Sequence, residues 1–221
     1  MKSRYYDKFN HDEDAHDYDN DVLNEDNPVR TGYAELLSWT AGLVNDFKPD
    51  RLIELGSGSG NLTLMINEHT AVDAVDISVE MIRLAKQKLA GRQNVRFIQD
   101  DLLGFFETGA AADAVVSTYA VHHLTESEKE LLCRKIYGCL KPGELAVIGD
   151  LGFESAAVKT EYYDELEKSG RGDLIKDIED EFFWDVESAV SMMADIGFSV
   201  EVKKFSELSW GFHLGKGYNK Q

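Results

Sequence analysis

Short apolar runs alternate with longer amphipathic stretches between residues 30 and 150. Runs rich in branched apolar residues that stop at turns are typical of buried parallel strands. Apolar positions at helical spacing are typical of helices packed on a sheet. The alternation predicts parallel strands at 52–55, 72–76, 94–101, 113–119 and 145–150. It also predicts helices at 30–47, 61–66, 79–89 and 126–140.

The chain after residue 150 has a different pattern. Residues 151–184 are strongly charged and helical in composition, and they carry the aromatic side chains of Tyr162, Tyr163, Phe182, Phe183 and Trp184. A helix is predicted at 185–196, because the glycine at 197 suits its C-terminal end. Apolar residues then alternate over 198–202 and 208–214, which predicts two strands joined by a short connection.

Three glycines follow the first predicted strand, in the order Gly56-Ser57-Gly58-Ser59-Gly60. Glycine suits a sharp strand-to-helix turn because it tolerates positive φ and lets a ligand approach the backbone closely. The helix that follows offers N–H groups and the positive end of its dipole. Asp76 ends the second strand, twenty residues after Gly56, where a Rossmann-type fold binds the ribose hydroxyls. The segment from Arg51 to Asp76 is therefore predicted to bind a nucleoside.

The spacing of the glycines distinguishes between two nucleoside cofactors. Dinucleotide-binding turns read G-x-G-x-x-G, whereas the third glycine here, Gly60, comes one residue earlier. An NAD-dependent oxidoreductase on the same fold is therefore disfavoured. With Glu54 two residues before the first glycine, the segment resembles the class I S-adenosylmethionine-dependent methyltransferases.

This resemblance implies a set of residues around S-adenosylmethionine. An acid after the third strand accepts a hydrogen bond from the adenine amino group in that family. Asp101 is the positional match, and Asp100 stays possible because Gln99 replaces a commoner glycine. Met81 is expected either to touch the adenine or only to pack in the core. The implied cofactor-binding residues are Glu54, Gly56, Ser57, Gly58, Gly60, Asp76, Ile77, Met81, Asp100, Asp101, Leu102 and Thr118.

The segment from Ser117 to Thr125, followed by Glu128-Lys129, resembles the YrrT-type small methyltransferases, and so does Gly60 to Thr63. The likeness extends from about Phe9 to the C-terminus. It implies a single α/β domain with a Rossmann-like, seven-stranded, mostly parallel sheet, an antiparallel C-terminal strand pair and helices on both faces. Its expected parts are an N-terminal lid or tail (1–29), a cofactor-binding core (30–150), a helical insertion (151–184), and a last helix with the terminal strand pair (185–221).

Candidate catalytic residues follow the fourth strand. His122 and His123 are candidate general bases. We expect only one of them to face the cleft, because adjacent residues entering a helix point in different directions. Tyr119 is a third candidate catalytic residue, and Tyr119 and Asp150, at predicted strand ends, are expected to line the acceptor side. No acid–base residue is obligatory, because positioning alone accelerates displacement at a sulfonium.

In the resembled family an insertion after the fifth strand often builds the acceptor pocket. The five aromatic side chains of 151–184 are therefore pocket candidates, and ordinary packing is the alternative.

Residues 1–27 are polar and mostly acidic, with Tyr5, Tyr6, Phe9 and Tyr18 interleaved. Such a segment is either a solvated tail or a lid whose aromatics close over the cofactor. The histidines at 11 and 16 lie among carboxylates, but their spacing fits no standard site, so no metal is expected.

The formal net charge of −18 limits the possible partners. A phosphate backbone is bound through Lys and Arg, so nucleic acid is not expected as a substrate, and neither is a membrane surface. The sequence has no apolar run of about 18 residues and no signal pattern, so a cytoplasmic location is expected. Cys133 and Cys139 fall in one predicted helix and are expected to be reduced, semi-buried thiols.

The sequence therefore predicts S-adenosylmethionine-dependent methyl transfer to a small-molecule acceptor. A non-catalytic S-adenosylmethionine-binding sensor or interaction protein is the alternative, since it would share every cofactor residue.

Overall fold

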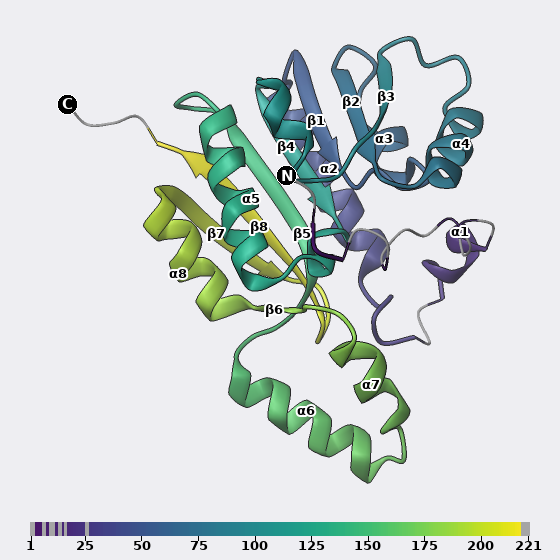
Figure 1. The fold of residues 1–221 in the computed structure, drawn as a ribbon, viewed down its shortest axis with the longest axis vertical. Coiled ribbons are helices and arrows are strands. Elements are labelled where there is room, and N and C mark those ends of the chain that lie inside the picture. Colours follow the sequence, from purple (N-terminus) through teal and green to yellow (C-terminus); the bar gives the residue numbers. More distant parts are fainter. Residues whose placement is uncertain are drawn as a thin grey trace.

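The computed structural model describes residues 3–5, 8, 12, 15, 17–24 and 27–217. At its centre is a sheet in the order β3-β2-β1-β4-β5-β8-β7 (Figure 1). The parallel strands are β1 (Arg51–Leu55), β2 (Ala71–Asp76), β3 (Val95–Gln99), β4 (Ala114–Thr118) and β5 (Leu145–Phe153). β8 (Ser209–Lys216) runs antiparallel to β5, and β7 (Phe198–Lys204) runs antiparallel to β8. The predicted mostly parallel sheet with an antiparallel C-terminal pair is confirmed.

Helices cover both faces of this sheet (Figure 1). On one face lie α2 (Tyr33–Phe47) and α3 (Asn61–Met65), and on the other lie α5 (Glu126–Cys139) and α8 (Val186–Ile196). Successive residues of β1 point to opposite faces of the sheet. Leu52 therefore packs on the face covered by α2 and α3, while Ile53 and Leu55 pack on the face covered by α5 and α8. α4 (Val79–Lys88) lies against β2 and β3.

Two helices, α4 and α5, begin at capping side chains. The Ser78 hydroxyl accepts a hydrogen bond from the Met81 amide at 3.0 Å, which caps α4. Thr125 and Glu128 form a reciprocal capping box at the start of α5. These local signals fix where each helix turns away from the end of its strand.

β5 is longer than predicted. It continues through Leu151 and Phe153, because Leu151 pairs with Ser209 of β8 and both apolar side chains are buried under the α2 layer. Its last two residues also pair with an unpredicted two-residue strand, β6 (Trp184–Asp185), so the sheet has an eighth strand. Asp150 is therefore inside a strand and fully buried, not at a strand end as expected.

Between β5 and β6 the chain makes an excursion that contains α6 (Ala156–Lys168) and α7 (Asp173–Glu179). Figure 1 shows these two helices extending below the sheet. The short elements are α1 (Tyr18–Asp21) and the 3₁₀ turns η1 (Phe105–Thr108) and η2 (Val121–His123). Among the described helices, none is long and apolar enough to cross a membrane.

The two cysteines of α5 differ in burial. Cys133 is fully enclosed and burial raises the pKa of its thiol to about 12, whereas Cys139 is half-buried. Both are unbridged, as expected.

Candidate functional site

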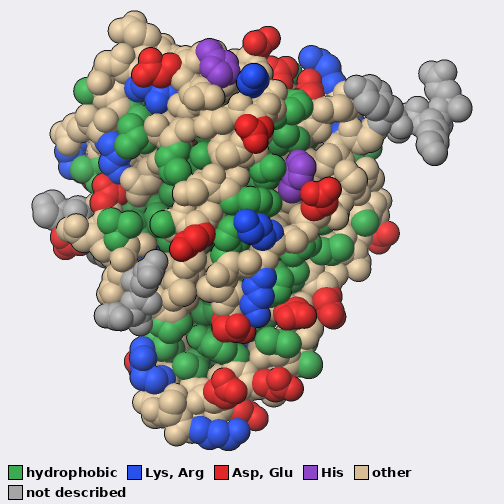
Figure 2. Space-filling view, turned by 180° about the vertical axis from the view of Figure 1, so that it is seen from behind, with side chains coloured by type: hydrophobic (Ala, Val, Ile, Leu, Met, Phe, Trp, Pro, Cys, Tyr) green, Lys and Arg blue, Asp and Glu red, His purple; other side chains and the backbone are tan. Residues whose placement is uncertain are grey.

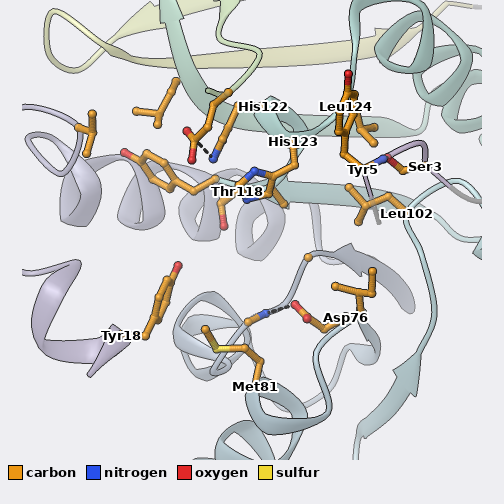
Figure 3. A pocket seen from close by; sticks show the side chains of 18 of the residues that line it. Ser3, Tyr5, Tyr18, Asp76, Met81, Leu102, Thr118, His122, His123 and Leu124 are labelled. Atoms are coloured by element: carbon orange, nitrogen blue, oxygen red, sulfur yellow. Dashed lines mark hydrogen bonds and ion pairs between the residues drawn. The ribbon is translucent and has the colours of Figure 1, made fainter. Parts of the chain in front are cut away.

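A cavity of about 510 Å³ lies at the carboxyl ends of the parallel strands, where open α/β sheets bind ligands. The turns after β1, β2, β3 and β4 form its walls, and Ser3, Tyr5 and Tyr18 of the N-terminal segment also line it (Figure 3). It brings together Gly56, Gly58, Asp76, Ile77, Met81, Asp101, Leu102, Thr118, Tyr119, His122 and His123 from the sequence-predicted set.

The turn after β1 needs glycine for two different reasons. Gly56 and Gly58 both have positive φ, at 69° and 52°. A Cβ on Gly56 would lie 2.3 Å from the Cβ of Ala120, so Gly56 lets the turns after β1 and β4 meet. A Cβ on Gly58 would meet no described atom within 4 Å, and Gly58 faces the cavity. Gly56 therefore permits close packing, and Gly58 keeps the cavity wall open.

Asp76 lies at the end of β2 and holds the glycine turn in place. Its carboxylate accepts hydrogen bonds from the Gly58 amide at 2.7 Å and the Ser78 amide at 2.9 Å (Figure 3). Burial raises the pKa of this carboxyl, and the backbone hydrogen bonds offset part of that rise. Asp76 is thus a nearly buried acceptor at the edge of the cavity.

The acid that faces the cavity after β3 is Asp101. Its carboxylate accepts from the amides of Leu103 at 2.9 Å and Ser3 at 3.2 Å. Asp100 does not line the cavity, and its carboxylate accepts from the Asp101 amide at 2.8 Å. Of the two acids that the sequence left open, the geometry favours Asp101.

Glu54 and Ser57 line a side pocket of about 20 Å³ that shares Gly56, Gly58 and Thr118 with the main cavity. The Ser57 hydroxyl is buried and has no hydrogen-bond partner among the described residues. The side pocket therefore has an unsatisfied polar atom next to the glycine turn.

The third glycine of the motif lies outside both pockets. Gly60 begins α3 with a φ of 85°, and a Cβ there would lie 3.0 Å from Leu89 and 3.3 Å from Ala85. Its place in the motif thus reflects packing of α3 on α4, and not contact with the cavity.

Glu54 makes stability depend on pH. Burial raises the pKa of its carboxyl from 4.5 to about 7, although the Thr63 hydroxyl donates to it at 2.6 Å. A raised folded-state pKa means that protonation favours the fold, so stability falls as the pH rises from about 4 to 7. Because one pKa unit corresponds to about 1.4 kcal/mol, the loss is about 3 kcal/mol. We expect Glu54→Gln to be more stable than wild type at pH 8 by up to that amount.

The measurement is urea unfolding of both proteins at pH 5 and pH 8, with the exposed Glu35→Gln as the control. The advantage of Glu54→Gln should nearly vanish at pH 5. An equal advantage at both pH values would show that Glu54 does not titrate as its burial implies.

His122 and His123 both line the cavity, so the expectation that only one would do so was wrong. They occupy the 3₁₀ turn η2 and not a regular helix, and their rings lie 4.1 Å apart between centroids (Figure 3). Nδ1 of His122 lies 2.5 Å from an Asp150 oxygen, and its amide donates to the other oxygen at 2.7 Å. Burial lowers the pKa of His122, but the Asp150 carboxylate outweighs this, and the pKa is raised overall.

Tyr119 lines the cavity as predicted, with a φ of +50° at the end of β4. Its hydroxyl lies 3.0 Å from the Ser209 hydroxyl, and burial raises its pKa well above the ordinary value. A phenol held in this way stays protonated at neutral pH, which favours a role for Tyr119 in shaping the cavity wall over a role as a general base.

The aromatic side chains of the excursion pack within the protein and do not line the cavity. Tyr162 and Tyr163 pack edge-on against Phe153, and Trp184 is fully buried. This confirms the packing alternative. The excursion instead contributes Glu181, which nothing in the sequence singled out.

The N-terminal segment contributes Ser3, Tyr5 and Tyr18 to the cavity (Figure 3). It is held by Asp19, whose carboxylate pairs with Lys88 at 2.7 Å and accepts from Ser59 at 2.5 Å. Residues Tyr6, Phe9, His11 and His16, singled out in the sequence, lie outside the described residues.

In a comparison with known protein families, residues 52–143 match the model of a methyltransferase domain. An uncharacterized methyltransferase of Oceanobacillus iheyensis is 30% identical over 197 residues, which are 87% of this chain and 89% of the relative. The uncharacterized methyltransferase YrrT of Halobacillus halophilus is 30% identical over 207 residues, 92% of this chain and 94% of the relative.

Among solved structures, the magnesium protoporphyrin IX methyltransferase of Synechocystis with bound S-adenosylhomocysteine has the same fold. It aligns with a TM-score of 0.70 and 17% identity, over 94% of this chain and 96% of the other. The identity and coverage of the two relatives show that the chain belongs to the YrrT-type methyltransferase family.

Proposed function

We propose that this protein transfers a methyl group from S-adenosylmethionine to a small-molecule acceptor. One observation carries the proposal. A single cavity joins the glycine turn and Asp76 to a second polar region formed by His122, His123 and Glu181. A transferase needs a donor site continuous with an acceptor site, whereas a protein that only binds the cofactor does not. The volume of about 510 Å³ is within the usual range for small-molecule sites, roughly 300–1,000 Å³.

The residues present fit the cofactor. The unpartnered Ser57 hydroxyl and the open space at Gly58 lie at the glycine turn, where a ligand would satisfy the first and fill the second. Asp76 would accept from the ribose hydroxyls and Asp101 from the adenine amino group. Ile77, Met81 and Leu102 would supply the apolar contacts to the adenine ring.

When bound, the cofactor would supply an electrophilic methyl carbon, whose bond to the sulfonium sulfur would break as the acceptor's lone pair bonds to it in line. The protein's own task is positioning, which can lower such a barrier by roughly 7–11 kcal/mol. Tyr119 and Leu151 also line the cavity. Tyr18 lies across it from the histidines, where a closed lid would limit access of water (Figure 3).

The charge of the protein favours a small molecule over a nucleic acid as acceptor. The net charge is −18. On the face shown in Figure 2, Lys and Arg side chains are scattered among acidic ones and do not form one basic area. Nucleic-acid binding depends on gathered basic side chains.

The test is calorimetry with S-adenosylhomocysteine and NAD, followed by a screen for S-adenosylhomocysteine release across a panel of small metabolites. We expect binding of S-adenosylhomocysteine and turnover with one acceptor class. Tighter binding of NAD would refute the assignment of the cofactor. Tight binding of S-adenosylhomocysteine without turnover on any thiol, amine or hydroxyl acceptor would favour a sensor.

The proposal includes the N-terminal segment as a lid. Deleting residues 1–20 removes Ser3, Tyr5 and Tyr18 from the cavity wall and breaks the Asp19–Lys88 ion pair. Re-exposing about 60 Å² of apolar ligand surface corresponds to roughly a 10-fold loss of affinity. We expect a loss of this size for S-adenosylhomocysteine in calorimetry. The melting temperature should change only slightly, because Ala15 is the only described residue in 1–20 that is buried in the core.

Asp19→Asn tests the same lid without a deletion, and Asp46→Asn, an exposed acid on α2, is its matched control. Asp19→Asn should weaken S-adenosylhomocysteine binding and Asp46→Asn should not. Unchanged affinity in both the truncated protein and Asp19→Asn would show that the segment is a passive tail.

A further inference from the structure

Three side chains of types that can bind a metal ion meet in the part of the cavity that is proposed to hold the acceptor, which we call the acceptor half. One ligand atom each of His122, His123 and Glu181 lies within 4.8 Å of the other two. Nε2 of His122 and a carboxylate oxygen of Glu181 are 3.6 Å apart. The three residues come from two distant parts of the chain, the turn after β4 and the segment after α7.

His122 is oriented as a metal-binding histidine is. Nδ1 lies against the buried Asp150 carboxylate, which leaves Nε2 directed toward Glu181. Histidine ligands commonly donate their second ring N–H to a carboxylate, which fixes the tautomer and the orientation of the ring. Asp150 also accepts from the Trp184 indole at 3.2 Å, so the carboxylate itself is held.

The segment that carries Glu181 is also tied to the histidine turn. The Phe182 amide donates to the His122 carbonyl at 2.9 Å, and the ammonium group of buried Lys129 donates to the Phe182 carbonyl. These contacts fix the backbone next to Glu181, although its own side chain is about a third exposed. Buried interactions therefore position His122 and the backbone that carries Glu181.

The separations suit a first-row transition ion. With bonds of about 2.0–2.2 Å to nitrogen and oxygen, two ligands of a tetrahedral ion lie roughly 3.4 Å apart, close to the observed 3.6 Å. Two imidazoles and one carboxylate suit Zn²⁺, Fe²⁺ or Co²⁺, whereas Mg²⁺ and Ca²⁺ take mainly oxygen ligands. We propose that His122, His123 and Glu181 bind a divalent transition-metal ion, with Zn²⁺ as the representative.

Such an ion would have an open position, because three protein ligands leave at least one site for another donor. All three ligands line the cavity, so the open position would be within the cavity, where the acceptor is proposed to bind. The ion would then hold the acceptor through its thiol or hydroxyl group and favour transfer of that group's proton to solvent water. This part rests on the proposed methyl transfer, whereas metal binding itself does not.

The experiment uses untagged, full-length protein that has been treated with a chelator and dialysed. Zn²⁺ is titrated by calorimetry and Co²⁺ by visible absorption, with Mg²⁺ as the competing ion. Glu181→Gln and His123→Gln test the ligands. Glu201→Gln and His213→Gln are matched controls, because these two residues form a surface pair at 3.4 Å between Nδ1 and the carboxylate. S-adenosylhomocysteine affinity is measured on every variant.

We expect one equivalent of Zn²⁺ per chain, without competition from Mg²⁺. Glu181→Gln and His123→Gln should each weaken Zn²⁺ binding by at least 10- to 100-fold, the loss typical for a residue that only supports a ligand. The surface controls should match wild type. Lack of saturable binding by wild type, or equal effects of Glu181→Gln and Glu201→Gln, would overturn the metal site and leave S-adenosylhomocysteine binding untouched. Zinc binding in a protein that fails to bind S-adenosylhomocysteine would support the metal site and refute the proposed function.

Discussion

Replacing Asp76 with alanine is expected to weaken S-adenosylhomocysteine binding by roughly 10- to 150-fold. A hydrogen bond to a charged group contributes about 1.5–3 kcal/mol, and 1.4 kcal/mol is tenfold in affinity. The structure adds a second reason for the loss. The same carboxylate accepts from Gly58 at 2.7 Å, so alanine also releases the amide that orders the glycine turn.

Two matched variants separate these contributions. Asp76→Asn keeps one acceptor oxygen for the Gly58 amide but loses the charge, so its affinity should lie between wild type and alanine. Asp73→Asn changes an acid on the same strand that pairs with Arg51 and Arg96 outside the cavity, and it should bind as wild type does. If calorimetry shows that folded Asp76→Ala retains wild-type affinity, Asp76 is not a cofactor ligand.

Alanine at Gly56 should mainly reduce stability, whereas alanine at Gly58 should mainly reduce cofactor affinity. Gly56→Ala combines a positive φ, which costs about 1–2 kcal/mol, with a contact of 2.3 Å to Ala120. Overpacking of this kind adds about 1–3 kcal/mol. We expect a total loss of about 2–5 kcal/mol in the free energy of unfolding, measured in urea.

Gly58→Ala should lose only the unfolding free energy that a positive φ costs, because its Cβ would meet no described atom within 4 Å. That Cβ would project where the cofactor is proposed to lie, so S-adenosylhomocysteine affinity should fall at least tenfold with only a small loss of stability. Equal destabilisation by the two variants, with equal affinity, would contradict the separate roles given to Gly56 and Gly58.

The parts of the fold that the sequence predicts are those set by local pattern. β1, the glycine turn and the acid that ends β2 follow one another within 26 residues, and each has a residue type that its geometry requires. The helix caps at Ser78 and Thr125 are likewise local, since the partner lies three residues away. Short-range physics therefore identifies the cofactor half of the cavity.

The acceptor half depends on pairs that are far apart in the chain. Asp150 meets His122 across 28 residues, and Glu181 is brought there by a segment tied to the His122 carbonyl. Tyr119 has a positive φ and the histidines follow in a 3₁₀ turn, and both line the cavity, which a helical reading of that segment does not predict. The spacing of apolar residues indicates local helices and strands and not contacts between distant residues. Nothing in the sequence therefore marks Glu181 as a residue of the site.

The pairing of β5 with β6 has a consequence for how this architecture can diversify. Gly152 and Phe153 pair with Trp184 and Asp185, so the excursion of α6 and α7 leaves and rejoins the sheet at one place. A loop whose ends are already joined can change length cheaply, since each doubling costs only about 0.6 kcal/mol in closure entropy. The excursion is thus a replaceable module, which evolution or an engineer can lengthen, shorten or exchange to suit a new acceptor while the cofactor half stays unaltered.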